Sequence, residues 1–131
     1  MTGDGRVAVP FLSLATPALP SAVGEIRRDV RAFASEHGAE GLALIAIELA
    51  VSEAMANAVV HGGVGTVRVE ADIEDGELEV VVLDEGPGFT GEPAPGLGMG
   101  LALMRDGATS FEVRDRPEGG VEVWMRFSLE P

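Results

Sequence analysis

The stretch Glu53-Ala-Met-Ala-Asn57 places a carboxylate and an amide one turn apart on a predicted helix. That helix is expected from about Ala39 to His61. Its apolar stripe is predicted to consist of Leu42, Ile45, Ala46 and Leu49. A period of 3.6 puts Glu53 and Asn57 on or beside this stripe, where polar groups are costly unless something satisfies them. On its own, the pair favours a simpler interpretation, a helix end that emerges into solvent.

Downstream, Val67–Ile73 and Leu78–Leu83 are predicted to form a hairpin. The second strand ends at Asp84, just before Gly86 and Gly88. An aspartate there can accept a hydrogen bond from an exocyclic amine such as that of adenine, and glycines let the backbone approach a flat ring closely. Aspartate, glycine and proline are also ordinary turn residues, so this motif alone is equally typical of a turn.

A third motif, Gly96-Leu-Gly98-Met-Gly100-Leu101, opens a short predicted helix that ends near Arg105. Free N–H groups at a helix start bind phosphate, so this loop is a candidate phosphate site. A Rossmann dinucleotide site is the alternative, but it requires a strand directly before the glycines. Here a loop rich in glycine and proline, Glu85–Gly98, precedes them, and the dinucleotide interpretation is disfavoured.

The remaining pattern supports one domain over residues 1–131, with residues 1–5 loose. A modest strand signal covers Val7–Phe11, and Ser21 is the predicted N-cap of a first helix. The apolar face of this helix is predicted to contain Val23, Ile26, Val30 and Phe33. A second hairpin is expected from Phe111–Val113 and Val121–Phe127. We therefore predict an α/β two-layer sandwich, in which a mixed, mostly antiparallel sheet carries helices on one face.

Composition excludes several functions. The net charge is −13, which disfavours direct binding of nucleic acid. The chain has no cysteine, so disulfides and thiolate metal sites are excluded and a cytoplasmic location is expected. All nine basic residues are arginine, which excludes a P-loop and a eukaryotic-type kinase site, since both need lysine. Polar residues within the apolar stretch Leu42–Val60 argue against a membrane span.

Together, the three motifs resemble those of the GHKL (histidine kinase-like) ATPase superfamily. Within it, the short chain is most similar to the bacterial anti-sigma factor serine/threonine kinases. The segment from Ser52 to Gly62 is similar to the N box of that family, and the two glycine motifs to its glycine boxes. The resemblance covers about residues 6–129.

This resemblance implies ATP and Mg²⁺ as cofactors and assigns a role to each motif. Glu53 would be the catalytic general base, and Asn57 would ligate the Mg²⁺ that bridges the ATP phosphates. Asp84 would bind the adenine amine. The base, ribose and phosphates would lie against Gly86, Gly88, Gly96, Gly98, Gly100 and Leu101. Arg27 would contact a protein partner.

The function implied is that of a serine/threonine protein kinase acting as an anti-sigma factor. Such proteins bind a sigma factor, phosphorylate an anti-anti-sigma protein and are commonly homodimers. One alternative is a non-catalytic module that binds ATP and protein partners without phosphotransfer. Another is a kinase-like domain cut from a larger phosphatase or sensor, against which the predicted terminal strands near Val7 and Leu129 argue.

Overall fold

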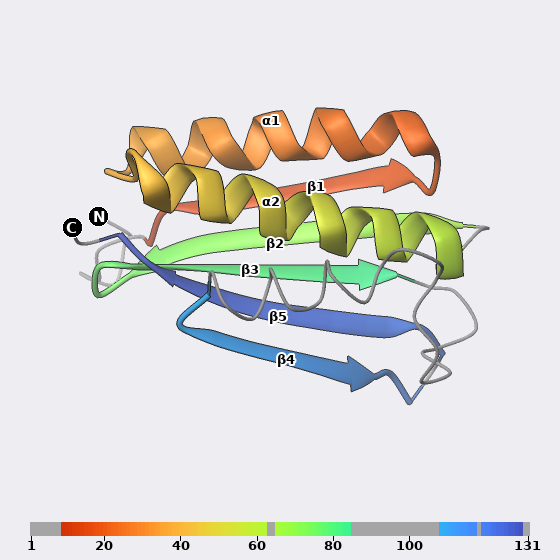
Figure 1. The fold of residues 1–131 in the computed structure, drawn as a ribbon. Helices are drawn as coiled ribbons and strands as arrows, with labels where there is room; N and C mark the ends of the chain where they lie inside the picture. The colour runs from red at the N-terminus through yellow and green to blue at the C-terminus, as the bar shows by residue number, and fades with distance from the viewer. Residues whose placement is uncertain (1–8, 63–64, 85–107, 118, 130–131) are drawn as a thin grey trace, which may run out of the picture.

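Two helices cover one face of a five-stranded sheet in the computed structural model of the chain, which describes residues 9–62, 65–84, 108–117 and 119–129 (Figure 1). The strands are β1 (Phe11–Pro17), β2 (Thr66–Glu74), β3 (Glu77–Asp84), β4 (Ser110–Asp115) and β5 (Val121–Ser128). Their order is β1-β2-β3-β5-β4, and each neighbouring pair is antiparallel. The predicted two-layer α/β sandwich with helices on one face is confirmed.

The two predicted hairpins are confirmed. Strands β2 and β3 are joined at Asp75 and Gly76, whose φ angles are 53° and 76°. Two consecutive residues with positive φ are typical of the tight turn that matches the twist of a hairpin. Strands β4 and β5 pair from Ser110↔Arg126 to Asp115↔Val121.

The core lies between the sheet and the helices, and alternation along β2 and β5 contributes much of it. In β5, Val121, Val123, Met125 and Phe127 are buried, whereas the residues between them are half-buried or exposed. Successive side chains of a strand point to opposite faces of the sheet, so one face of β5 packs under the helices. The same alternation buries Val67, Val69 and Ala71 of β2.

The first helix, α1, spans Pro20–Glu36, and its inner face contains Ile26, Val30 and Phe33, as predicted. Its start differs from the prediction: Leu19 occupies the N-cap position, and Pro20 is the first helical residue. Proline suits that position because its φ is already helical and it has no N–H that would need a partner.

Strand β1 begins at Phe11, where the sequence signal was predicted to end, and it continues to Pro17. The expected strand over Val7–Phe11 is therefore displaced, and Val7 lies outside the described residues. The strand is an edge strand that pairs only with β2 in the described part of the chain. A proline is tolerated at its end because an edge strand has a side without a pairing partner.

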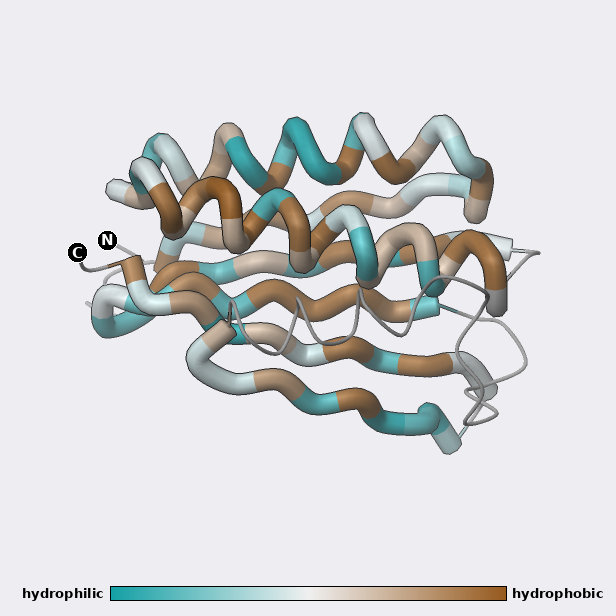
Figure 2. Tube along the Cα trace, in the orientation of Figure 1, coloured by the Kyte–Doolittle hydropathy of each residue, from teal (hydrophilic) through white to brown (hydrophobic). Residues whose placement is uncertain are grey.

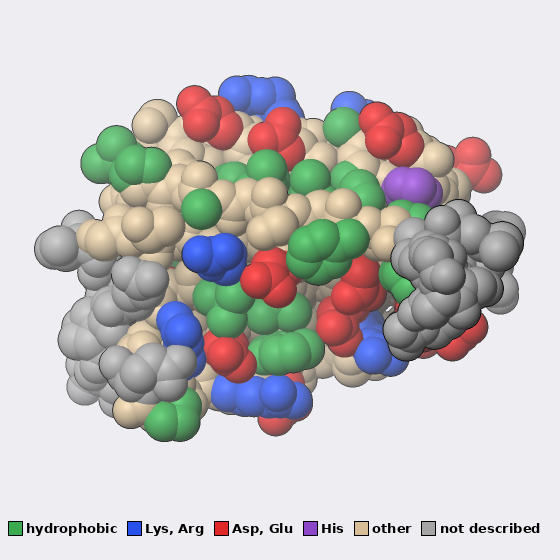
Figure 3. All heavy atoms as spheres, turned by 180° about the vertical axis from the view of Figure 1, so that it is seen from behind, with side chains coloured by type: hydrophobic (Ala, Val, Ile, Leu, Met, Phe, Trp, Pro, Cys, Tyr) green, Lys and Arg blue, Asp and Glu red, His purple; other side chains and the backbone are tan. Residues whose placement is uncertain are grey.

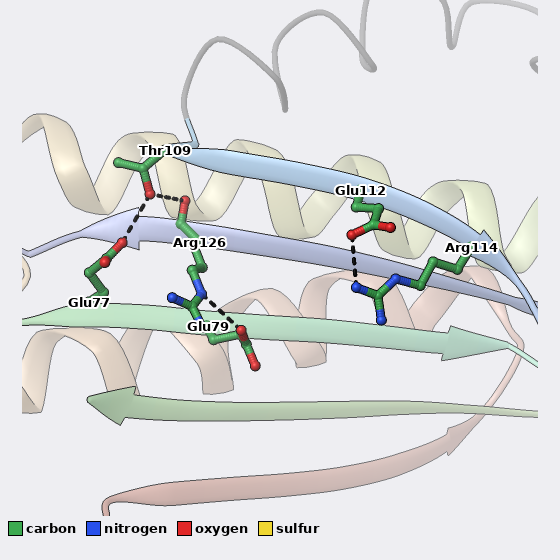
Figure 4. A network of polar contacts seen from close by, with 6 residues as sticks. All are labelled: Glu77, Glu79, Thr109, Glu112, Arg114 and Arg126. Carbon is green, nitrogen blue, oxygen red and sulfur yellow. Dashed lines mark hydrogen bonds and ion pairs between the residues drawn. The ribbon is translucent and has the colours of Figure 1, made fainter. Parts of the chain in front are cut away.

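The sheet face turned away from the helices is charged and open. Figure 3 shows hydrophobic side chains on this side between acidic and basic ones. Arg126 Nε donates to Glu79 Oε2 at 2.9 Å, and Thr109 Oγ1 donates to Glu77 Oε2 at 3.2 Å (Figure 4). Partial burial, followed by the nearby carboxylates of Glu79 and Glu74, raises the pKa of Asp72 on this face.

Candidate nucleotide site

The second helix, α2 (Leu42–Asn57), continues into a short π-helical turn, η1 (Ala58–Gly62). Its buried residues are Ile47, Ala50, Val51, Ala54 and Met55. These residues recur at helical spacing and fix one face of α2 on the sheet. They also fix the direction of every other side chain of the helix, including those of Glu53 and Asn57.

The apolar stripe predicted for α2 is not the buried face of the helix, so this prediction is wrong. Leu42, Ile45 and Leu49 are 83%, 53% and 45% exposed, and Ala46 is half-buried. The reason is that α2 is apolar on almost every side, so periodicity could not select its inner face. Figure 2 shows hydrophobic residues along much of α2, whereas α1 carries hydrophilic residues on its outer turns.

Glu53 and Asn57 are both half-buried, and both lie on the flank of α2 away from α1. Ser52 lines a groove between α2 and α1. A helix turns by about 100° per residue, so Glu53 is carried to the other flank, and Asn57 lies one turn beyond it. The two side chains therefore share a flank, as predicted, but this flank borders the core and is not part of the buried face.

Asp84 ends β3 and is 7% exposed, and it is the buried charged residue of the described part of the chain. Its neighbours across the sheet are Val67 on β2 and Val121 on β5. A buried carboxylate is costly unless it is compensated by polar groups. Its burial at the end of the central strand keeps Asp84 a candidate binding residue.

Topology brings Asp84 to the same end of the molecule as Glu53 and Asn57. Figure 1 shows the last turns of α2 and η1 at the end of the sheet where β3 terminates. Both α2 and η1 contact β3. The helix segment that carries Glu53 and Asn57 and the strand that ends at Asp84 thus terminate at the same end of the molecule.

The other predicted site residues fall into two groups. Gly86, Gly88, Gly96, Gly98, Gly100 and Leu101 lie outside the described residues. Arg27 is exposed on α1 and lines the groove against α2, so it lies on a different surface from Glu53. Among the described site residues, Glu53, Asn57 and Asp84 do not line this groove.

The donor groups near the end of α2 fit a metal that is held together with a ligand. Among the residues that the structure describes, no three histidines or acids are grouped so that they could hold an ion. Asn57 offers an amide oxygen and Glu53 a carboxylate, and oxygen is the ligand that Mg²⁺ prefers. A small protein contribution completed by phosphate oxygens and water is the common form of a Mg²⁺ site in nucleotide-binding proteins.

Sequence reasoning missed the outer surface of the helix layer. Leu42, Ile45 and Leu49 are exposed there beside arginines of α1. The available signal was the general apolarity of α2, which is more than one buried face requires. Read by length and composition, Leu42–Val60 is apolar enough to cross a membrane, but in this fold its inner face packs in the core.

The two-layer sandwich, with Glu53 and Asn57 on α2 and Asp84 at the end of β3, agrees with a known family of domains. Residues 16–127 match the model of the histidine kinase-like ATPase domain. The chain belongs to this family of ATP-binding domains.

Curated relatives cover most of the chain. It is 30% identical over 134 residues to the anti-sigma F factor of Shouchella clausii. The alignment covers 90% of this chain and 92% of that protein. The chain is 31% identical over 135 residues to the serine-protein kinase RsbW of Bacillus subtilis, covering 88% and 83% of the two chains.

The fold is also similar to a solved structure. The crystal structure of the RsbU and RsbW domains of a Mycobacterium tuberculosis protein matches with a TM-score of 0.72 and 26% identity. The match covers 94% of the present chain and 33% of that chain, so the present chain spans about a third of the larger protein.

Proposed function

We propose that the protein is an ATP- and Mg²⁺-dependent serine/threonine protein kinase that acts as an anti-sigma factor. It would phosphorylate an anti-anti-sigma partner and sequester a sigma factor in the cytoplasm. The observation that carries this proposal is the shared flank of Glu53 and Asn57, at the end of the molecule where Asp84 terminates β3. The names of the curated relatives, anti-sigma F factor and serine-protein kinase, support it.

The proposed reaction assigns one role to each of these groups. Asp84 would accept a hydrogen bond from the adenine amine and orient ATP, and Gly86 and Gly88 would line the base and ribose. Asn57 and the phosphates would hold Mg²⁺, which would neutralise charge on the γ-phosphate. Gly96, Gly98, Gly100 and Leu101 would direct backbone N–H groups at the phosphates.

Glu53 performs the proton transfer. Its carboxylate accepts the proton from a serine or threonine hydroxyl of the partner as the hydroxyl oxygen attacks the γ-phosphorus. A new O–P bond forms, the bond between the γ-phosphorus and the bridging oxygen breaks, and ADP leaves with that electron pair. The partner becomes a phosphoprotein, and no residue of this chain carries a covalent intermediate.

Assembly and partner contact belong to the same proposal. Arg27, exposed on α1, would contact the protein partner, as the resemblance to the family implies. A homodimer is proposed because the family that the sequence resembles commonly forms one. Sedimentation of the purified chain with and without ATP tests this assembly directly.

A phosphotransfer assay tests the base assignment. Glu53→Ala should bind ATP with nearly wild-type affinity and lose phosphotransfer by about 10²- to 10⁴-fold, the usual contribution of a general base. Glu40→Ala, an exposed acid just before α2, is the matched control and should leave the rate unchanged. Transfer of radiolabelled phosphate to the cognate partner by Glu53→Ala at the wild-type rate would contradict the assignment. Binding of ATP and partner by the wild-type chain without any transfer would instead identify a non-catalytic module.

A further inference from the structure

The outer surface of the helix layer contains a groove between α1 and α2 of about 340 Å³. We name it the helix groove, and it is lined by Arg27, Arg28, Arg31, Ile45, Glu48, Leu49 and Ser52. One rim is basic and belongs to α1, and the other is apolar and belongs to α2. The proposed catalytic base, Glu53, is not among the residues that line this groove.

The apolar rim is an unusual feature for a protein surface. Leu42, Ile45 and Leu49 are all more than two-fifths exposed, and they recur at spacings of three and four along α2. Such residues form a continuous ridge on one side of a helix, about 10 Å long at 1.5 Å per residue. Isolated exposed apolar residues are ordinary, but an aligned ridge beside a groove is typical of a protein–protein contact.

The basic rim contrasts with the charge of the whole chain. Three of its nine arginines lie on this rim, although the net charge is −13. Arg31 is paired with Glu48, its Nε lying 2.7 Å from Oε1. In the described part of the chain, neither Arg27 nor Arg28 has an ion-pair partner.

The guanidinium groups of Arg27 and Arg28 also converge. A Cβ placed on Gly24 would lie 3.5 Å from Nη1 of Arg28 and 3.9 Å from Nη2 of Arg27. Two like charges near one point repel each other, and an acidic group of a partner would relieve this repulsion. The absence of a side chain at Gly24 leaves room for such a group beside both arginines.

We propose that the helix groove binds an amphipathic helix of a partner protein, with an apolar face and acidic residues along one flank. Its apolar face would pack against Ile45 and Leu49, and its acidic flank would meet Arg27 and Arg28. A helix laid in a groove is recognised through anchors at positions i, i+3, i+4 and i+7, which the spacing of the ridge matches. This inference deepens the proposed function, because it assigns the chemistry of the partner and the place where it docks.

The probe is a fluorescein-labelled helical peptide of 18 residues with leucine at positions i, i+3, i+4 and i+7 and glutamate on one flank. A second peptide has the same leucines and lysine in place of every glutamate. Fluorescence anisotropy with the full chain should show binding of the acidic peptide, weakened by added salt, and about tenfold weaker binding of the basic one. Equal affinity for both peptides, or no binding of the acidic peptide, would overturn the proposal.

Substitutions of exposed residues test whether the peptide binds in the helix groove, and they leave the packing of the core unchanged. Ile45→Ser, Leu49→Ser, Arg27→Glu and Arg28→Glu should each weaken the acidic peptide by about fivefold or more. Phe11→Ser and Arg68→Glu, exposed residues of the sheet, are the matched apolar and charged controls and should bind normally. Normal binding by all four groove variants, or a loss of binding in the controls, would refute the location.

Two other occupants are outcomes that overturn the inference. If Leu49→Ser converts a dimer of the chain into a monomer in sedimentation, a second copy occupies the groove. If vesicles of phosphatidylcholine and phosphatidylglycerol bind the wild-type chain and not Leu49→Ser, the ridge is a lipid contact. Calorimetry with ATP separates this inference from the proposed function, because the groove variants should bind ATP normally. A wild-type chain that binds the peptide but does not bind ATP would contradict only the kinase.

Discussion

Arg31 Nε lies 2.7 Å from Glu48 Oε1, so a single ion pair joins the outer surfaces of α1 and α2. The two side chains are 55% and 32% exposed, and solvent therefore screens their attraction. Glu48→Gln should lower the free energy of unfolding by only about 0.2–1 kcal/mol, the range of exposed pairs. Urea unfolding followed by circular dichroism measures this difference.

The free energy of unfolding of Glu48→Gln at high salt provides a control for this prediction. At 1 M salt the Debye length is about 3 Å, so wild type and Glu48→Gln should then be nearly equal in stability. A loss above about 2 kcal/mol that persists in salt would mean that the pair holds the two helices together.

Two isoleucines two positions apart on α2 provide a sharper comparison. Ile47 is fully buried, whereas Ile45 is 53% exposed. Ile47→Ala should cost about 2–5 kcal/mol, because it removes buried methylene groups and leaves a cavity. Ile45→Ala should stay within about 0.5 kcal/mol of wild type. Equal losses in chemical denaturation would contradict the orientation of α2.

Asp72 should make stability depend on pH. Its folded-state pKa is raised above 3.8, first by burial and then by Glu79 and Glu74, so its charged form is disfavoured in the folded protein. As the pH falls, the folded protein binds this proton at a higher pH than the unfolded chain does. The charged carboxylate therefore lowers the free energy of unfolding by its full amount above the raised pKa, and this loss disappears below 3.8.

Replacing Asp72 by asparagine isolates this contribution. Asp72→Asn should raise the free energy of unfolding at pH 7 by about 0.5 kcal/mol, the scale of partly exposed charges. The difference from wild type should shrink to nothing as the pH falls below 3.8. Thermal melts of both proteins over the range from pH 7 to pH 3 measure it. A stabilisation that grows as the pH falls would have the opposite sign and reject this account.

A substitution of Asp84 tests the binding of ATP separately from the proton transfer by Glu53. Asp84→Asn removes the charge that is proposed to accept a hydrogen bond from the adenine amine. Hydrogen bonds to charged groups contribute about 1.5–3 kcal/mol, so the Kd for ATP should rise about 10- to 150-fold. Isothermal titration with ATP measures this change, and a melt without nucleotide verifies that the variant is folded. An unchanged Kd in a folded variant would remove Asp84 from the site.

The strands and hairpins could be predicted from the sequence because their alternation is unambiguous. In β5, Val121 through Phe127 alternates apolar and polar residues, and the structure buries only one set. The turn at Asp75 and Gly76 carries its own signal in residues that tolerate positive φ. Each of these features is local, so a single sequence is sufficient to predict it.

The inner face of α2 could not be predicted in the same way. Ile45 and Ile47 are the same residue type, yet one is exposed and the other buried. When a helix is apolar on most sides, only its contacts with the sheet and with α1 determine its rotation. The bounds of β1 also differ from the prediction, because pairing with β2 extends the strand to Pro17 although the local sequence signal there is weak.

The candidate site was predicted as a set of residue types, and its placement required the topology. The spacing of Glu53 and Asn57 indicates a shared helix flank from sequence alone. Their proximity to the end of β3 depends on α2 running over the sheet in the same direction as that strand (Figure 1). No local pattern encodes that direction, because it results from the connections between the layers.

The central position of β3, between β2 and β5, has a consequence for where the protein opens. Its backbone is hydrogen-bonded along both edges, so its amides exchange with deuterium only when the whole domain unfolds. Strands β1 and β4 lie at the ends of the sheet order, and their amides should exchange first. Asp84 is thus attached to the strand whose amides should exchange most slowly, and the carboxylate should keep its position even when the edge strands open.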